Sequence, residues 1–211
     1  MRNELDGEGV KAMLHAAATA VVAGVDRLTE ADLAIGDGDH GIGMRRGFEA
    51  ALTALDALGP TDPAGALKAV GMAVMSNTGG AAGAVFGTWF RSGAKPLEGA
   101  PALDGAGFAA FLEAGLAAVC KRGGAAEGQK TMIDALAPAA AAARATADAR
   151  LGQTLAAAAR AAHAGCEATK DMLATTGKAR SLGDRCLGFV DPGAISVTII
   201  LDAMLDHVTA R

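Results

Sequence analysis

The sequence predicts an all-α protein, folded as an antiparallel up-and-down bundle or barrel of about eight helices. Three observations support this class. Alanine, the strongest helix former, dominates the chain. The alternation of β-branched residues that is typical of strands is almost absent, so we expect no strands. Short glycine-bearing connections favour antiparallel neighbours. At 211 residues, we expect one domain spanning residues 1–211.

Helix start and stop signals give the expected helices in chain order. Aspartate followed by proline is a typical start, because the carboxylate caps the first turn and the proline occupies a position whose amide hydrogen is not needed. Asp62 and Asp191 both precede a proline, and Asp104 caps a further helix. The longest loop is expected from residue 91 to 104. The expected helices cover residues 7–27, 43–58, 63 onward, 80–93, 104 onward, 130–147, 151–176 and 195–208.

Charge and composition exclude several classes of partner. The net charge of -4 and the pI near 5.5 provide no broad basic surface, so we expect neither a nucleic acid nor an anionic membrane as partner. The start of the chain lacks a secretory signal pattern, and no stretch of about 18 apolar residues occurs. Three cysteines without CxxC spacing predict free thiols. A cytoplasmic location is therefore expected.

Three aspartates, Asp32, Asp37 and Asp39, lie within eight residues, separated by glycines that allow unusual backbone angles. Converging carboxylates repel one another, and an all-oxygen cluster is typical of a site for a hard ion such as Mg²⁺. An EF-hand counted from Asp37 fails, because Ile42 and Phe48 stand where glycine and glutamate are needed. The alternative is a turn that only caps the following helix.

Three further segments carry polar or glycine-rich patterns. SNTGGAAGAVFG precedes a helix and could present backbone N–H groups to an anion, although it is no Walker A loop. In EGQKTMIDALAP, Lys130 and Asp134 have the spacing of a helical pair, for which a solvated surface pair is the alternative. The segment TGKARSLGDRCLGFVDPGAISV carries Lys178, Arg180 and Arg185. It could bind a phosphate or form an ordinary basic turn.

Together these segments supply the components of a magnesium–nucleotide site without a P-loop: carboxylates for a metal, backbone amides for phosphate and cations for the remaining charge. The chain resembles, over nearly its whole length, the nucleotide-binding L subunit (L domain) of dihydroxyacetone kinases. The resemblance is carried by GDGDHGIGM, by the glycine turn with Gly83 and Gly87, by GQKTMIDALAP, and by LGDR followed by DPGAISV. It implies an eight-helix antiparallel barrel with the nucleotide at one end.

The resemblance also implies roles for individual residues. Asp32, Asp37 and Asp39 would hold Mg²⁺ ions that bridge the phosphates of ADP or ATP. His40 is not expected to act as a base, and its ring could instead orient an aspartate. The expected nucleotide-binding residues are His40, Gly41, Ile42, Gly43, Gly80, Ala81, Ala82, Gly123, Met132, Lys178, Arg185, Asp191, Pro192 and Gly193.

The sequence departs from the family pattern at several of these positions. Family members usually carry serine or threonine at the positions of Ala81 and Ala82, so hydroxyl contacts to phosphate are absent while the backbone donors remain. Lys178 replaces an arginine and keeps the charge without the bidentate fork. The other departures are Gly43 for asparagine, Ser181 for tyrosine and Gln129 for aspartate.

The function expected from the resemblance is that of a phosphotransferase subunit. It would bind Mg-ADP or Mg-ATP and donate a phosphoryl group to dihydroxyacetone, or to a related short-chain ketose or polyol, held on a separate K subunit. The nucleotide would be either exchangeable ATP or a bound ADP that a phosphotransferase-system protein rephosphorylates. The alternative is a non-catalytic helical adaptor that binds metal or nucleotide and regulates a K-like partner.

Overall fold

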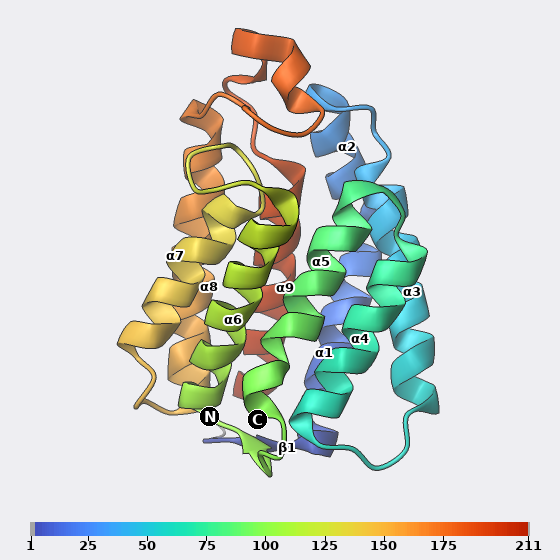
Figure 1. Cartoon of the computed structure of the whole chain (residues 1–211), viewed down its shortest axis with the longest axis vertical. Coiled ribbons are helices and arrows are strands. Elements are labelled where there is room, and N and C mark those ends of the chain that lie inside the picture. Colours follow the sequence, from blue (N-terminus) through green and yellow to red (C-terminus); the bar gives the residue numbers. More distant parts are fainter. Residues whose placement is uncertain (1–2, 211) are drawn as a thin grey trace.

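The computed structural model describes residues 3–210, and these are mainly helical (Figure 1). The predicted all-α class is confirmed, but nine α-helices occur in the described part, and two short strands pair antiparallel. The expectation of no strands is therefore wrong for these four residues. The elements are β1 (Leu5–Asp6), α1 (Gly7–Ala23), α2 (Val25–Ile35), α3 (His40–Ala57), α4 (Pro63–Asn77), α5 (Gly80–Gly93), η1 (Lys95–Leu97), β2 (Ala102–Leu103), α6 (Gly105–Gly123), α7 (Ile133–Ala145), α8 (Leu151–Ala168), η2 (Thr169–Asp171), η3 (Ala179–Cys186) and α9 (Pro192–Thr209).

Eight of the helices pack in chain order around a common core. Helix α1 packs on α3, each helix from α3 to α8 packs on the next, and α9 packs back on α1 (Figure 1). Helix α2 takes no place in this sequence of neighbours and instead contacts α1, α3, α9 and η3. Within residues 3–210, no helix is both long enough and apolar enough to cross a membrane.

Local hydrogen bonds explain where the expected helices change. The helix predicted over 7–27 ends at Ala23, because the Gly24 N–H bonds back to Ala20 and Val21 and a new helix, α2, then begins. The helix predicted over 130–147 starts only at Ile133, after a turn that Asp134 closes. The helix predicted over 151–176 ends at residue 168. The longest described stretch without α-helix consequently lies at 169–191, not at the predicted 91–104.

Small residues let the helices approach closely around the aromatic core. A Cβ on Gly87 of α5 would lie 2.8 Å from the carbonyl oxygen of Gly71 in α4. A Cβ on Gly115 of α6 would lie 2.4 Å from Cδ1 of Trp89 in α5. Trp89 and its neighbouring phenylalanines are buried in this core. The three cysteines are free, as predicted, and Cys166 and Cys186 are buried.

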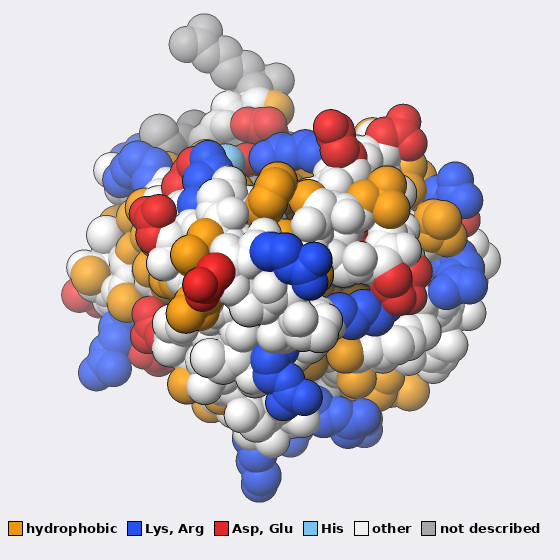
Figure 2. All heavy atoms as spheres, turned by 90° about the horizontal axis from the view of Figure 1, so that it is seen from above, with side chains coloured by type: hydrophobic (Ala, Val, Ile, Leu, Met, Phe, Trp, Pro, Cys, Tyr) orange, Lys and Arg blue, Asp and Glu red, His pale blue; other side chains and the backbone are white. Residues whose placement is uncertain are grey.

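The up-and-down order places the starts of alternate helices at the same end of the molecule. Helices α3, α5, α7 and α9 all begin at the end that also carries α2 and η3 (Figure 1). Viewed from above, this end shows basic, acidic and apolar side chains interspersed rather than a continuous basic face (Figure 2). Four helix N-termini thus converge on one region, which is where the candidate site lies.

Candidate functional site

A cavity of about 370 Å³ opens among these four helix starts. It is lined by His40 of α3, Gly80 of α5, Ile133 of α7 and Pro192 of α9, together with their neighbours. The first turn of a helix has N–H groups without partners inside the helix, and the helix dipole adds positive potential. The start of α5 has no side-chain cap. The start of α5 therefore offers uncapped backbone donors to an anion, whereas amides at the starts of α3, α7 and α9 already donate to side-chain oxygens.

The acidic cluster lies at one side of this cavity. Asp32 is buried on the last turns of α2, whereas Asp37 and Asp39 are exposed on the turn into α3. One oxygen from each carboxylate lies within 4.8 Å of the others. The turn requires glycine, since Gly38 has φ of 79° and a Cβ on Gly36 would lie 2.2 Å from Asp32 Oδ1. This all-oxygen donor set fits a hard divalent cation such as Mg²⁺.

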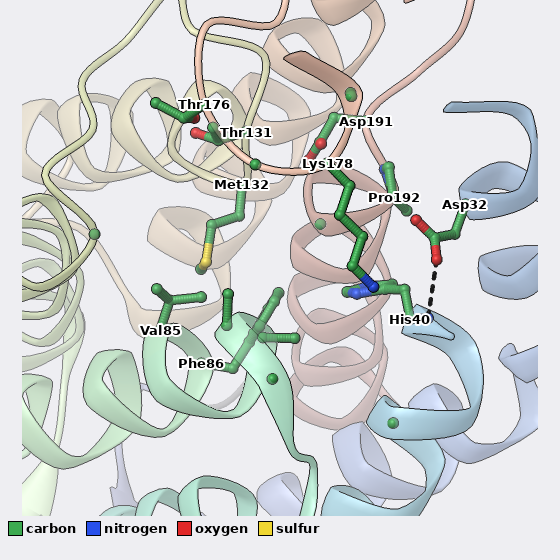
Figure 3. Close-up of a pocket in the computed structure, with 18 of the residues that line it drawn as sticks. Asp32, His40, Val85, Phe86, Thr131, Met132, Thr176, Lys178, Asp191 and Pro192 are labelled. Atoms are coloured by element: carbon green, nitrogen blue, oxygen red, sulfur yellow. Dashed lines mark hydrogen bonds between the residues drawn. The ribbon is translucent and has the colours of Figure 1, made fainter. Parts of the chain in front are cut away.

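Lys178 provides the positive charge that faces these carboxylates. Its Nζ lies 2.5 Å from both Asp37 oxygens and 2.9 Å from Asp39 Oδ2. Figure 3 shows the side chain crossing the cavity toward His40. Hydrogen bonding to Lys178 lowers the pKa of Asp37, and the two carboxylates raise the pKa of Lys178. An ammonium group thus occupies the place where a metal ion would neutralise the cluster.

His40 links the acidic cluster to α9. Its backbone N–H donates to Asp32 Oδ2 at 3.0 Å (Figure 3), and its Nε2 lies 2.8 Å from Ser196 Oγ. Burial lowers the pKa of the imidazole below its ordinary value. The suggestion that the ring orients an aspartate is wrong for this geometry, because the backbone amide contacts Asp32 while the ring contacts Ser196.

Lys130 and Asp134 do not form the solvated surface pair considered above. Lys130 is only 2% exposed, and its Nζ donates to the carbonyl oxygens of Thr169 and, at 2.6 Å, of Phe189. Asp134 accepts hydrogen bonds from two backbone amides of the preceding turn, and burial lowers the pKa of Lys130. Lys130 therefore joins the two ends of the segment 170–188, the segment that carries Lys178.

Asp191 caps the start of α9 from inside the cavity. Its Oδ2 accepts a hydrogen bond from the Ala194 N–H at 2.8 Å, and its own N–H donates to Thr169 Oγ1 at 3.0 Å. Burial away from water raises the pKa of this carboxyl group to about 7.

Apolar side chains line the part of the cavity away from the carboxylates. Val85 and Met132 lie on the opposite side of the cavity from Asp32 (Figure 3). Phe86 lies between them and His40, with its ring centroid 6.3 Å from that of the imidazole. Binding sites for small molecules commonly combine such an apolar surface with a few fixed polar groups. The two halves together suit a ligand with one flat apolar part and one strongly anionic part.

The structure brings most of the predicted site residues together. Arg185 and Ile42 are exposed and outside the cavity lining, and Gly41 packs against α2. Asp37 lines a smaller cavity that shares Lys178 with the first. The predicted residues that line the main cavity are Asp32, Asp39, His40, Gly43, Gly80, Ala81, Ala82, Gly123, Met132, Lys178, Asp191, Pro192 and Gly193.

Sequence reasoning missed other residues that line the cavity. Arg46 lies three residues after Gly43 on α3, so helical spacing from the predicted positions indicated it. Val85 and Phe86 follow Ala81 and Ala82 by one turn in the same way. Lys130 carried no such signal, because it lies before its helix and has φ of 60°. The remaining unpredicted lining residues are Ile35, Thr78, Gly79, Val119, Ala125, Thr131, Ile133, Thr176, Gly177 and Ala179.

Comparison with known proteins finds a matching family model and relatives that are named as subunits of dihydroxyacetone kinases. Residues 34–206 match the family model described as DAK2 domain. The chain is 38% identical over 178 residues to "PEP-dependent dihydroxyacetone kinase 1, ADP-binding subunit DhaL" of Listeria innocua, covering 84% of this chain and 85% of that protein. It is 35% identical to the ADP-binding subunit DhaL of the PEP-dependent dihydroxyacetone kinase of Escherichia coli, again covering 84% and 85%.

Two solved structures that are similar to this chain belong to longer chains. The dihydroxyacetone kinase of C. freundii in complex with AMP-PNP and Mg²⁺ matches 98% of this chain with a TM-score of 0.72 and 26% identity. Its native form gives a TM-score of 0.73 at 27% identity. The present chain spans only about a third of those chains, 35% and 36% respectively. The likeness therefore concerns one part of each of those kinases.

Proposed function

The chain belongs to the DAK2 domain family, and from this premise we propose that it is the nucleotide-binding subunit of a dihydroxyacetone-kinase-type phosphotransferase. Residues 1–211 act as one L-type domain that binds Mg-ADP or Mg-ATP. The observation that carries the proposal is the convergence of four helix N-termini on the cavity beside three carboxylates. This arrangement suits a polyphosphate that arrives with its metal.

Each half of the cavity has a distinct task in this proposal. Asp32, Asp37 and Asp39 hold Mg²⁺, which neutralises charge on the phosphates when bound. The uncapped backbone amides at Gly80 face the same anion and stabilise charge on the transferring group, and the start of α9 at Gly193 adds the positive end of its dipole. The apolar surface around Val85, Phe86 and Met132 takes the nucleobase. Ala81 and Ala82 contribute backbone donors only, so phosphate binding here depends on amides and cations rather than hydroxyls.

The phosphoryl acceptor lies on another chain in this proposal. Dihydroxyacetone or a related short-chain ketose or polyol is held on a K subunit, and the present chain supplies the donor. The phosphoryl group comes either from exchangeable ATP or from a bound ADP that a phosphotransferase-system protein rephosphorylates. The relatives named as PEP-dependent, ADP-binding subunits favour the second route.

Phosphoryl transfer to dihydroxyacetone tests the function directly. The purified chain is combined with a K subunit and either ATP or a phosphotransferase-system donor, and dihydroxyacetone phosphate is measured. We expect product with wild type, and at least about a hundredfold less with Asp37→Ala, because the metal loses one of its ligands. Asp148→Ala, an exposed aspartate outside the cavity, is the matched control and retains activity.

A non-catalytic adaptor is the second candidate function. The observation that favours it is the pair Ala81 and Ala82, at positions where family members usually carry serine or threonine. An adaptor would bind Mg-nucleotide and the K-like partner but transfer no phosphate with either donor. Absence of product from a folded protein that still binds Mg-ADP would select the adaptor and reject the transferase.

A further inference from the structure

Ser196 lies on the second turn of α9, directly behind His40. Its side chain is fully buried and does not line the cavity. Its Oγ lies 2.8 Å from His40 Nε2, and its hydroxyl donates to the Pro192 carbonyl oxygen at 3.1 Å. Ser196 therefore does not contact a ligand in the cavity directly but bonds to two residues that line it, His40 and Pro192.

The positions of the hydrogen atoms follow from counting donors. The Pro192 carbonyl oxygen can only accept a hydrogen bond, so we assign the one hydrogen of the Ser196 hydroxyl to its 3.1 Å contact with that oxygen. The lone pairs of Ser196 Oγ are then what faces His40, so Nε2 must carry the hydrogen of that bond. The Pro192 carbonyl also lies beside the ring as a further acceptor. Since a neutral imidazole has a single N–H, Nδ1 keeps a free lone pair.

The other ring nitrogen is left for the ligand. The contact of the His40 ring with Ser196 is through Nε2, and the ring itself lines the cavity beside Asp32 and Asp39. We infer that Ser196 is a positioning residue that fixes the Nε2–H tautomer of His40. In this tautomer Nδ1 accepts a hydrogen bond from an O–H donor of the bound ligand. The second half of this inference rests on the proposed nucleotide function.

The chemistry of a lone pair restricts what can contact Nδ1. A phosphate oxygen is itself an acceptor and is repelled, so His40 does not bind phosphate through this nitrogen. The matching donors are a water molecule bound to the metal and a hydroxyl of the ribose. Fixing the tautomer orients this contact before the ligand arrives, as partners behind a metal site generally do.

Nitrogen-15 NMR of the ligand-free wild-type protein tests the tautomer without any assay of function. With the ring neutral, we expect the His40 signals of a protonated Nε2 and an unprotonated Nδ1. In Ser196→Ala the signals shift toward a mixture of the two tautomers. A protonated Nδ1 in the wild type would overturn the inference, even if Ser196→Ala fails to fold.

Binding of two ligands tests the consequence. The probes are Mg²⁺ with inorganic pyrophosphate, which offers metal-bound water, and Mg-ADP, which adds ribose hydroxyls. We expect Ser196→Ala to weaken binding about tenfold, for both ligands if water is the donor and for Mg-ADP alone if ribose is. Thr198→Val is the matched control, because Thr198 is a buried hydroxyl on the same helix that bonds only to Ile195 and does not line the cavity.

The two outcomes that oppose the account are distinguishable. If Ser196→Ala binds both ligands as well as Thr198→Val does, the positioning role is overturned while the proposed function stands. If the wild type binds neither ligand, the proposed function fails and with it the ligand contact of Nδ1. The NMR measurement then still decides whether Ser196 fixes the tautomer.

Discussion

Lys178 is the residue whose position has the clearest consequence for metal binding. Its ammonium group contacts both Asp37 and Asp39, so a divalent cation must compete with it for these carboxylates. We expect Lys178→Gln to bind Mn²⁺, in the absence of nucleotide, several-fold more tightly than wild type, because the competing charge is gone. Isothermal titration with Mn²⁺ measures this difference.

The neighbouring Arg180 provides the control for this substitution. It lies in the same segment and is exposed, and no hydrogen bond or ion pair of its side chain is recorded in the described structure. Arg180→Gln removes the same formal charge and should leave Mn²⁺ affinity within about twofold, since exposed charges act weakly at a distance. Weaker Mn²⁺ binding by Lys178→Gln would show that Lys178 supports the metal rather than competing with it.

Site residues that belong to a local sequence motif were predictable. Site residues that only the tertiary structure brings together were not. Asp32 and Asp39 converge with His40 as their short spacing and the intervening glycines suggested. The partner of His40 was not predictable, because Ser196 lies 156 residues further along the chain. Lys130 was misread, since a lysine in a polar segment is normally solvated and only the tertiary structure provides its two carbonyl partners.

At the scale of elements, the segment 170–188 depends on a clamp at its two ends. The Lys130 ammonium bonds to the carbonyls of Thr169 and Phe189, and the Gly188 N–H donates to the Lys170 carbonyl. Lys130→Met keeps the length of the side chain but removes the ammonium donor from both carbonyls, so that the Thr169 oxygen keeps only the bond from the Met172 N–H. We expect a loss of about 2–3 kcal/mol in the free energy of unfolding, measured by chemical denaturation, and faster amide exchange in 170–188.

Lys170→Met is the control for this prediction. Lys170 lies in the same segment, but its side chain is 43% exposed and forms a surface ion pair with Glu167. Such pairs contribute about 0–1 kcal/mol, so this variant should unfold almost like wild type. Equal stability of the two variants would contradict the clamp.

Helix packing depends on glycine at particular contacts. Gly115→Ala would place a Cβ 2.4 Å from Trp89 Cδ1 and 3.0 Å from the Trp89 carbonyl oxygen. We expect it to lower the free energy of unfolding by about 1–3 kcal/mol, because α5 and α6 must move apart. Gly123→Ala, on the same helix, meets only Val85 Cγ1 at 3.8 Å and should be neutral or stabilising by about 0.5 kcal/mol. Thermal or denaturant unfolding of the two variants distinguishes the effects.

The existence of most elements was predictable, while their ends and α2 were not. Aspartate caps correctly marked the starts of α4, α6 and α9, because the capping bond is local to the first turn. The break at Gly24 was missed, since a single glycine inside a helical pattern does not by itself end a helix. The helical pattern past residue 168 also led to a wrong prediction of the end of α8. The backbone there bonds to Lys130 and does not continue the helix that its periodicity indicates.

At the scale of the whole molecule, the antiparallel order explains why the site lies where it does. Because α9 packs back on α1, the helices enclose one core, and the starts of α3, α5, α7 and α9 meet at a single end. The helical class followed from composition and caps alone. The convergence of four helix N-termini could not be predicted in the same way, because it depends on how the helices are arranged in space.

Calorimetric titration of nucleotide-free protein with ADP is the most direct test of the central claim, that this end of the molecule binds a magnesium–nucleotide complex. ADP is added once in the presence of Mg²⁺ and once in excess EDTA. The account predicts binding with Mg²⁺ and a large loss of affinity in EDTA, because three carboxylates beside the cavity would otherwise repel the phosphates. Absence of ADP binding in both conditions, or equal affinity in both, would contradict it.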